Sequence, residues 1–235
     1  MDFKNGEILY VDKPLRWTSF AVVNKLRYHL CRKLGVKKLK VGHAGTLDPL
    51  ATGVMIICTG KATKRIEEFQ YHTKEYVATL CLGATTPSFD LEKEIDATYP
   101  TAHITREQVE EVLPRFVGTI EQIPPAFSAC KIEGKRAYEL ARKGSDVELK
   151  PKTLVIDEIE LLDYSLPEIT IRVVCSKGTY IRALARDIGQ ALQSGAHLVA
   201  LKRTRVGEVR LEDCMKVDDF ESWLEAQDIE EVKNE

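Results

Sequence analysis

Residues 42–54 read Gly42-His43-Ala44-Gly45-Thr46-Leu47-Asp48-Pro49-Leu50-Ala51-Thr52-Gly53-Val54. Residues 42–49 are too rich in glycine for a helix or a strand and predict a loop. At Gly42, Gly45 and Gly53 the backbone can approach a ligand closely. Asp48 is the carboxylate of the loop. Taken by itself, an Asp before a Pro favours a helix start, with Asp as the N-cap and Pro at the first helical position.

Outward from this loop, the charge of the chain is strongly asymmetric. The segment from Lys13 to Lys40 holds nine Lys or Arg and no acid, whereas Leu211 to Glu235 holds ten acids and two lysines. Most basic stretches simply face solvent. A stretch of this length without any acid, however, indicates a surface that binds a polyanion such as nucleic acid. A carboxylate at the end of such a surface would repel phosphate. Asp48 therefore fits a reacting group better than a phosphate ligand.

The amino-acid composition limits the classes of protein to which this chain can belong. The chain has 235 residues, a formal net charge of −2, 44% hydrophobic and 30% charged residues, which is typical of a globular protein with a sizeable core. It has no apolar run of the roughly 18 to 20 residues of a membrane span and no signal-like N-terminus, so we expect a cytoplasmic protein without membrane contact. The six cysteines and five histidines are scattered, which predicts neither a structural metal nor disulfides.

The pattern of apolar residues predicts an α+β fold, because strands and helices do not alternate regularly. Helices are expected at 18–33, 62–69, 105–116, 136–143, 181–192 and 218–226. Strands are expected at 8–11, 54–58, 76–82, 127–132, 156–162, 169–175, 198–202 and 207–211. Two nucleotide folds are excluded: residues 53–61 have the wrong spacing for a phosphate loop, and no Gly-x-Gly-x-x-Gly follows a strand.

Four further residues are candidates, and each also has an ordinary explanation. His43 could be a hydrogen-bonded structural histidine, and Tyr76 a half-buried strand aromatic. Tyr180 could be a packing residue, and Arg182 a solvated helix residue. None of them decides a function alone.

Several blocks of the sequence, taken together, resemble the TruB-type tRNA pseudouridine synthases. The signature is residues 42–54, and the blocks run in the family's order from about residue 8 to residue 211. The other blocks are Lys13-Pro14, Trp17-Thr18-Ser19, Lys74-Glu75-Tyr76, residues 122–129, Lys131, Gly134, residues 136–142, residues 178–182 and residues 201–207.

The resemblance implies a mixed, largely antiparallel central sheet flanked by helices, with an active-site cleft across its middle. It implies isomerisation of the uridine at position 55 in the T loop of tRNA, without a cofactor or a metal. The family's nucleophile falls on Asp48, its base-stacking tyrosine on Tyr76 and its carboxylate-pairing arginine on Arg182. Substrate-contacting positions fall on His43, Tyr180 and Leu201. Lys13 opens the basic face that would contact phosphates.

Two segments depart from the family's pattern. Phe127 replaces a usual Tyr, and residues 85–90 differ from a usual Thr-x-Thr-x-Asp run, which puts the contacts of that loop in doubt. We expect a catalytic domain at 1–211 and an acidic helical tail at 212–235, without the PUA-type RNA-binding domain of many relatives, in a monomer.

Two alternatives stay open at this point. The chain could be a non-catalytic RNA-binding module on the same scaffold, or a synthase acting on another RNA. The sequence also leaves open whether attack occurs at C1′ of the sugar or C6 of the base, or whether deprotonation comes first.

Overall fold

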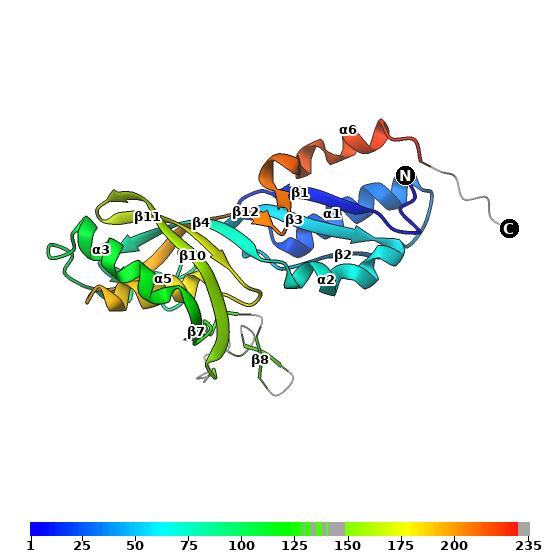
Figure 1. Ribbon diagram of the computed structural model, residues 1–235. Coiled ribbons are helices and arrows are strands. Elements are labelled where there is room, and N and C mark those ends of the chain that lie inside the picture. The colour runs from blue at the N-terminus through cyan, green and yellow to red at the C-terminus, as the bar shows by residue number, and fades with distance from the viewer. Residues whose placement is uncertain (129, 133–134, 138–139, 141–148, 230–235) are drawn as a thin grey trace. The chain divides into compact units, whose positions relative to one another are not determined.

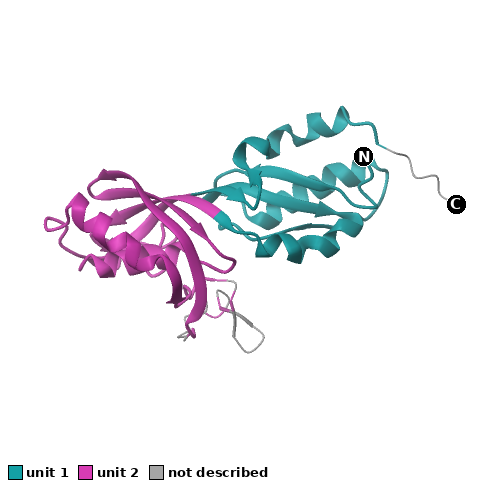
Figure 2. Ribbon diagram, in the orientation of Figure 1, with its two compact units in different colours: residues 1–74, 202–235 teal, residues 75–201 magenta. Residues whose placement is uncertain are grey.

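The computed structural model describes residues 1–128, 130–132, 135–137, 140 and 149–229. It divides into two compact units (Figure 2), and each is described by itself. Unit 1 is Met1–Lys74 with Lys202–Glu235, and unit 2 is Glu75–Leu201. The chain passes from one unit to the other within strands β4 (Lys74–Leu82) and β12 (Ala196–Val206). The expected acidic tail at 212–235 falls in unit 1, and its separation from a 1–211 domain stays a prediction.

Unit 1 mixes helices and strands along the chain (Figure 1). Its strands, besides the end of β12, are β1 (Ile8–Lys13), β2 (Val41–His43), β3 (Ala51–Thr59), β13 (Val209–Arg210) and β14 (Met215–Lys216). Its helices are α1 (Ser19–Lys33), α2 (Ile66–Tyr71) and α6 (Phe220–Glu225), with 3-10 turns at Gly60–Arg65, Leu211–Asp213 and Val217–Asp219.

The strands of unit 1 are ordered β14-β1-β3-β12, with β2 on β3 and β13 on β12. β1 runs antiparallel to β3 and places Lys13 opposite Gly53, whereas β1 and β14 are parallel. Nearly all side chains of β3 are buried, among them Val54, Ile56 and Cys58 in a core cluster. The register therefore places Gly53 at the end of β1, whereas Gly42 and His43 pair with Cys58 and Ile57 at the other end of β3.

Helix α1 begins as the sequence predicts. Thr18 is its N-cap, and its hydroxyl accepts a hydrogen bond from the Ala21 N–H at 3.0 Å. Such a cap stabilises a helix by about 1 kcal/mol. Helix α6 packs against α1, and Lys25 forms an ion pair with Asp218 at 2.6 Å. The acidic tail thus neutralises part of the basic segment.

Unit 2 holds most of the long strands (Figure 1). Its strands, besides β4 and the start of β12, are β5 (Ala84–Thr85), β6 (Ala97–Thr98), β7 (Gly118–Gln122), β8 (Lys131–Ile132), β9 (Lys135–Arg136), β10 (Lys152–Ser165) and β11 (Glu168–Cys175). Its helices are α3 (Arg106–Val112) and α5 (Ile181–Ala191), with a 3-10 turn at Leu113–Phe116.

The strands of unit 2 are ordered β12-β4-β11-β10-β7, and β10 pairs antiparallel with both β11 and β7. Helix α5 buries Ile181, Leu184, Ala185 and Ile188, as its apolar period predicts. The α+β class and the largely antiparallel sheet are therefore confirmed.

Some predicted elements differ from the structure. The helix expected at 62–69 is a 3-10 turn followed by α2, and strands β2, β5, β6, β7, β9 and β14 were not predicted as strands. These strands have two to five residues, and a glycine opens β7 or lies within β2, so they show no clear period. The helix expected at 136–143 lies largely outside the described residues, and the described part of 127–132 is a strand only at Lys131–Ile132.

Candidate active site

The loop that carries Asp48 joins β2 to β3 in unit 1. Asp48 is partly exposed, and its carbonyl accepts a hydrogen bond from the Ala51 N–H at 3.0 Å. Ala51 opens a strand, so Asp48-Pro49 does not start a helix here. The explanation of Asp48 as a helix N-cap is therefore wrong, and a carboxylate at this position requires a different explanation.

The residue before Asp48 is held by a buried hydroxyl of α1. Ser19 Oγ accepts from the Leu47 N–H at 2.9 Å and donates to the Leu47 carbonyl at 3.0 Å. Ser19 and Leu47 are both buried. Because both backbone groups of Leu47 are fixed, the position of Asp48 is fixed from its N-terminal side.

Lys13 is fully buried, which differs from the expected surface position. Alternate residues of β1 face the core, and Lys13 is one of the inward set. Its Nζ donates to the carbonyls of Pro14 at 3.0 Å, Trp17 at 2.6 Å and Pro49 at 3.4 Å. Burial lowers the pKa of Lys13 to about 8, although the charge of Asp48 opposes this. Lys13 thus links the segment that precedes α1 to the loop, rather than facing solvent.

Arg203 of β12 holds the two ends of the loop, and the sequence reasoning did not single it out. It is buried, and its guanidinium donates to the carbonyls of Val54 at 2.8 Å and Gly45 at 3.2 Å. Gly53 packs against its backbone so closely that a Cβ there would lie 2.2 Å from the Arg203 carbonyl oxygen. The 201–207 block contained the signal, since Arg203 lies inside it.

His43 ends strand β2, next to this loop. Burial, followed by the charge of Arg203, lowers the pKa of His43 below its ordinary value, so the imidazole is neutral at pH 7. Its Nδ1 is buried and has no hydrogen-bond partner among the described residues. A neutral ring that is only partly exposed suits insertion between bases better than a phosphate contact.

The other predicted site residues belong to unit 2. Tyr76 is on the buried side of β4 with 9% of its surface exposed, and Leu201 is a partly buried residue of β12. Tyr76 is a strand aromatic, as the ordinary explanation expects, but it is buried rather than half-buried. Its burial does not exclude a stacking role, which stays a prediction.

Arg182, the second residue of α5, is 4% exposed and therefore not a solvated helix residue. Its guanidinium donates to the carbonyls of Ser88 at 3.3 Å and Phe127 at 3.0 Å. Its Nε lies 3.8 Å from Oδ2 of Asp90, which is also buried. A planar guanidinium held from three sides has one orientation.

Asp90 is the acidic residue that the sequence reasoning missed. It ends the run Thr86-Pro87-Ser88-Phe89-Asp90, which keeps a hydroxyl, a hydroxyl and a carboxylate at the family's Thr-x-Thr-x-Asp spacing, with Ser for the second Thr. Thr86 and Ser88 both donate to the Asp90 carbonyl, at 2.6 and 3.4 Å. At these three positions the sequence therefore differs from the family's pattern only by Ser88 in place of the second Thr.

Tyr180 is the N-cap of α5, and its backbone is clamped by a buried amide. Gln122 Nε2 donates to the Tyr180 carbonyl at 3.1 Å, and Gln122 Oε1 accepts from its N–H at 2.9 Å. Burial and then the contact with Cys130 raise the pKa of Tyr180 well above its ordinary value. The phenol is therefore protonated throughout the physiological range.

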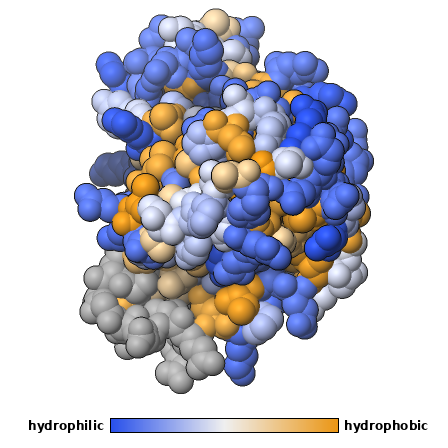
Figure 3. All heavy atoms as spheres, turned by 90° about the vertical axis from the view of Figure 1, so that its left-hand side faces the viewer, coloured by the Kyte–Doolittle hydropathy of each residue, from blue (hydrophilic) through white to orange (hydrophobic). Residues whose placement is uncertain are grey.

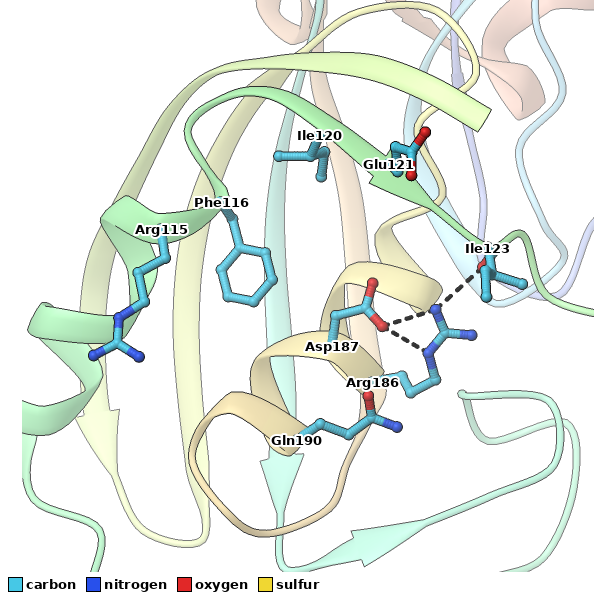
Figure 4. Close-up of a pocket in the computed structure, with 8 residues that line it drawn as sticks. All are labelled: Arg115, Phe116, Ile120, Glu121, Ile123, Arg186, Asp187 and Gln190. Carbon is cyan, nitrogen blue, oxygen red and sulfur yellow. Dashed lines mark hydrogen bonds and ion pairs between the residues drawn. The ribbon is translucent and has the colours of Figure 1, made fainter. Parts of the chain in front are cut away.

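Unit 2 also has a surface cleft of about 490 Å³ between the 3-10 turn at Leu113–Phe116, β7 and α5 (Figure 4). Arg186 donates there to Asp187 at 2.7 Å and to the Ile123 carbonyl at 3.2 Å. The other residues that line the cleft are Arg115, Phe116, Ile120, Glu121 and Gln190. With its charges of both signs and no predicted site residue, this cleft does not resemble a uridine site.

On the face shown in Figure 3, apolar patches are separated by hydrophilic side chains. Among the described residues, no helix is long and apolar enough to cross a membrane. No cluster of three or more His, Cys, Asp or Glu with metal-binding geometry occurs in the described part of the chain.

Comparison with known proteins gives concordant results. Residues 32–181 match the family described as TruB family pseudouridylate synthase (N terminal domain), and residues 182–233 match the tRNA pseudouridylate synthase B C-terminal domain. The chain is 82% identical, over the full length of both proteins, to "tRNA pseudouridine synthase B" of Phocaeicola vulgatus. It is 76% identical to the protein of that name from Bacteroides fragilis, over 98% of this chain and 99% of the relative.

Among solved structures, the chain is similar to one in "Crystal Structure of a Cbf5-Nop10-Gar1 Complex". The TM-score is 0.68 at 29% identity, and the match covers 96% of this chain and 57% of that one. It is also similar, with TM-score 0.66 and 27% identity, to a chain in "Structure of H/ACA RNP bound to a substrate RNA containing 2'-deoxyuridine", covering 95% of this chain and 56% of that one.

Proposed function

This chain belongs to the TruB family of tRNA pseudouridine synthases and is an isomerase that converts uridine in tRNA to pseudouridine, and we propose that its target is the uridine at position 55 in the T loop. The observation that carries the proposal is the loop around Asp48. Asp48 is partly exposed, and three buried side chains, Ser19, Lys13 and Arg203, hold the backbone beside it. A reacting group needs this kind of fixed support.

In the proposed reaction the bond between C1′ of the ribose and N1 of uracil breaks. The uracil turns, its C5 bonds to the same C1′, the C5 proton is lost and N1 gains a proton. No electrons are gained or lost overall. Asp48 supplies the carboxylate that acts on the sugar or the base as nucleophile or base.

Arg182 and Tyr76 contribute to the same reaction in this proposal. Arg182 supplies the positive charge that keeps the reacting carboxylate ionised, since an opposite charge lowers the pKa of a carboxyl group. Its two backbone acceptors and Asp90 fix the guanidinium for that role. Tyr76 stacks on the extruded uracil and assists removal of the C5 proton.

Extrusion of the uridine costs a few kcal/mol, which contacts elsewhere must offset. His43, neutral and partly exposed, is proposed to fill the place that the base leaves. Phosphate contacts come from exposed cations of unit 1, for example Arg32, Lys37 and Lys38, while the buried Lys13 acts by holding the loop.

The position is tested with two RNA hairpins of equal stem, one with the T-loop sequence and one with a scrambled loop that retains its uridines. Pseudouridine is mapped by carbodiimide-dependent primer-extension stops. We expect product at position 55 alone, with kcat/KM lower on the scrambled loop by at least about 100-fold. Equal rates on both hairpins would overturn the T-loop proposal and favour another RNA as substrate. Binding without product on any tRNA would favour an RNA-binding module.

A further inference from the structure

Polar side chains from separate segments of unit 2 meet at one sulfur atom. Cys130 is 6% exposed, and its Sγ lies 3.2 Å from Tyr180 Oη and 3.3 Å from Lys152 Nζ. Ser128 is buried beside them, and its Oγ accepts from the Cys130 N–H at 3.4 Å. Lys152 is the first residue of β10, so its exposed stem reaches inward to a buried partner.

The direction of these hydrogen bonds follows from what each group can offer. A lysine ammonium donates and cannot accept, so the sulfur accepts from Lys152. Burial raises the pKa of the Cys130 thiol, but the hydrogen bonds with Tyr180, Ser128 and Lys152 outweigh it, and the pKa is below its ordinary value. The pKa of Tyr180 is shifted upward, first by burial. Because the phenol keeps its proton and the sulfur already accepts from Lys152, we assign the hydrogen of the 3.2 Å contact to Tyr180 Oη and the acceptor to Cys130 Sγ.

Both ends of Tyr180 are thus fixed by different residues. Gln122 clamps its backbone N–H and carbonyl, and Cys130 engages its hydroxyl. A phenol has one hydrogen to donate. If that hydrogen is committed to the sulfur, the oxygen can only accept from any further partner.

We propose that Cys130 and Lys152 are positioning residues for Tyr180, which commit its hydroxyl hydrogen to Sγ and leave Oη as a pure hydrogen-bond acceptor for the bound nucleotide. The complementary group is a donor of that nucleotide, a ribose hydroxyl or the uracil N3–H. This inference rests on the proposed role of Tyr180 as a substrate contact. It adds that Cys130 and Lys152 determine which partner of this contact donates the hydrogen bond and which accepts it.

A double-mutant cycle on kcat/KM tests the proposal. Cys130→Ala and Tyr180→Phe are each expected to lower kcat/KM about tenfold, in line with the loss of one charge-assisted hydrogen bond. The double variant should be no slower than Tyr180→Phe, because Cys130 acts through the hydroxyl that Tyr180→Phe removes. A full further tenfold loss in the double variant, or no effect of Cys130→Ala, would overturn the proposal.

Conservative variants separate positioning from packing. Cys130→Ser keeps an acceptor at this place and should restore kcat/KM to within about threefold of the parent. Lys152→Met should lower kcat/KM in the same direction as Cys130→Ala. Cys81→Ala, at a partly buried cysteine of β4 in the same unit, is the matched control and should leave kcat/KM unchanged. Melting temperatures show that each variant folds.

A measurement that needs no activity distinguishes failure of this inference from failure of the proposed function. Iodoacetamide reacts with thiolates, so the alkylation rate of Cys130 at pH 7, followed by peptide mass mapping, reports its ionisation. We expect Lys152→Met to slow it about fivefold or more. An unchanged or faster rate would overturn the assignment of Lys152, whatever the enzyme does with tRNA.

Discussion

The two units carry an aspartate each on a loop, and they hold it in opposite ways. Asp90 of unit 2 is buried and lies beside the guanidinium of Arg182. Asp48 of unit 1 is partly exposed, and the buried cations near its loop, Lys13 and Arg203, donate to backbone carbonyls. The difference teaches that one carboxylate serves to fix an arginine, whereas the other is presented on a fixed backbone. We propose that only the second is the reacting group.

The largest effect on stability is expected at Arg182. Arg182→Met leaves Asp90 as a buried charge without its guanidinium and should lower the free energy of unfolding by about 3–5 kcal/mol, measured by urea denaturation. The control is Arg186→Met, one turn further along α5, where the guanidinium is more exposed and pairs with Asp187. Similar losses in the two variants would contradict the structural role of the Arg182–Asp90 pair.

On the Asp48 loop, a glycine substitution should have the next largest effect. Gly53→Ala places a Cβ 2.2 Å from the Arg203 carbonyl oxygen at a φ of +108°, and we expect it to cost about 3 kcal/mol. Gly35→Ala also has a positive φ but meets nothing within 4 Å, so it should cost about 1 kcal/mol. Equal melting temperatures of the two variants would mean that the loop is not held tightly by Arg203.

The buried lysine beside this loop gives a pH dependence with a defined sign. The pKa of Lys13 is about 8 in the folded chain against an ordinary 10.5. The unfolded state therefore binds more protons between these values, and stability rises with pH across that window, by about 3 kcal/mol. Urea denaturation of the parent and Lys13→Met at pH 7.5 to 10.5 isolates this contribution as their difference. A difference that falls or stays flat as pH rises would contradict the burial of Lys13.

The conservative change at the other aspartate should be milder. Asp90→Asn keeps the shape and the acceptor oxygen, so we expect a loss of about 1 kcal/mol in stability and a kcat reduced by about tenfold at most. The same change at Asp48 should abolish catalysis with little change in stability. A loss of activity at Asp90→Asn as complete as at Asp48→Asn would break the distinction between the two carboxylates.

The smallest effects are expected at the exposed cations of unit 1. Lys38→Gln should reduce the slope of log Kd for tRNA against log salt by about one unit or less. Lys25→Gln is the control, because Lys25 already pairs with Asp218. Equal changes in slope for the two variants would contradict the view that the acidic tail covers part of the basic segment.

The elements with a clear local signal could be predicted from the sequence. Thr18, followed by apolar residues at helical spacing, predicted the start of α1. The helical spacing of the apolar residues in 181–192 predicted α5. The glycines predicted a loop at 42–49, and the structure has one between β2, which ends at His43, and β3, which begins at Ala51. The helix start expected at Asp48 was wrong because β3 pairs with β1 and β2, and that pairing overrides the local preference of Asp-Pro.

The supporting residues of the site could not be predicted in the same way. Lys13 is buried because of its place in β1, and its carbonyl partners come from three separate residues. Asp90, Arg203 and Cys130 act through contacts distant in the sequence, for which local patterns carry no signal. The resemblance to a family supplied positions, and the structure supplied the contacts that hold them.

The most direct test of the central claim is tritium release from tRNA labelled with [5-³H]uridine, by the parent and by Asp48→Asn, with tRNA binding measured alongside. Formation of pseudouridine releases the C5 hydrogen, so the parent should release tritium. Asp48→Asn should lower the rate by about 10³-fold or more while Kd changes less than about threefold. Release that persists undiminished in Asp48→Asn would contradict the assignment of Asp48 as the reacting carboxylate.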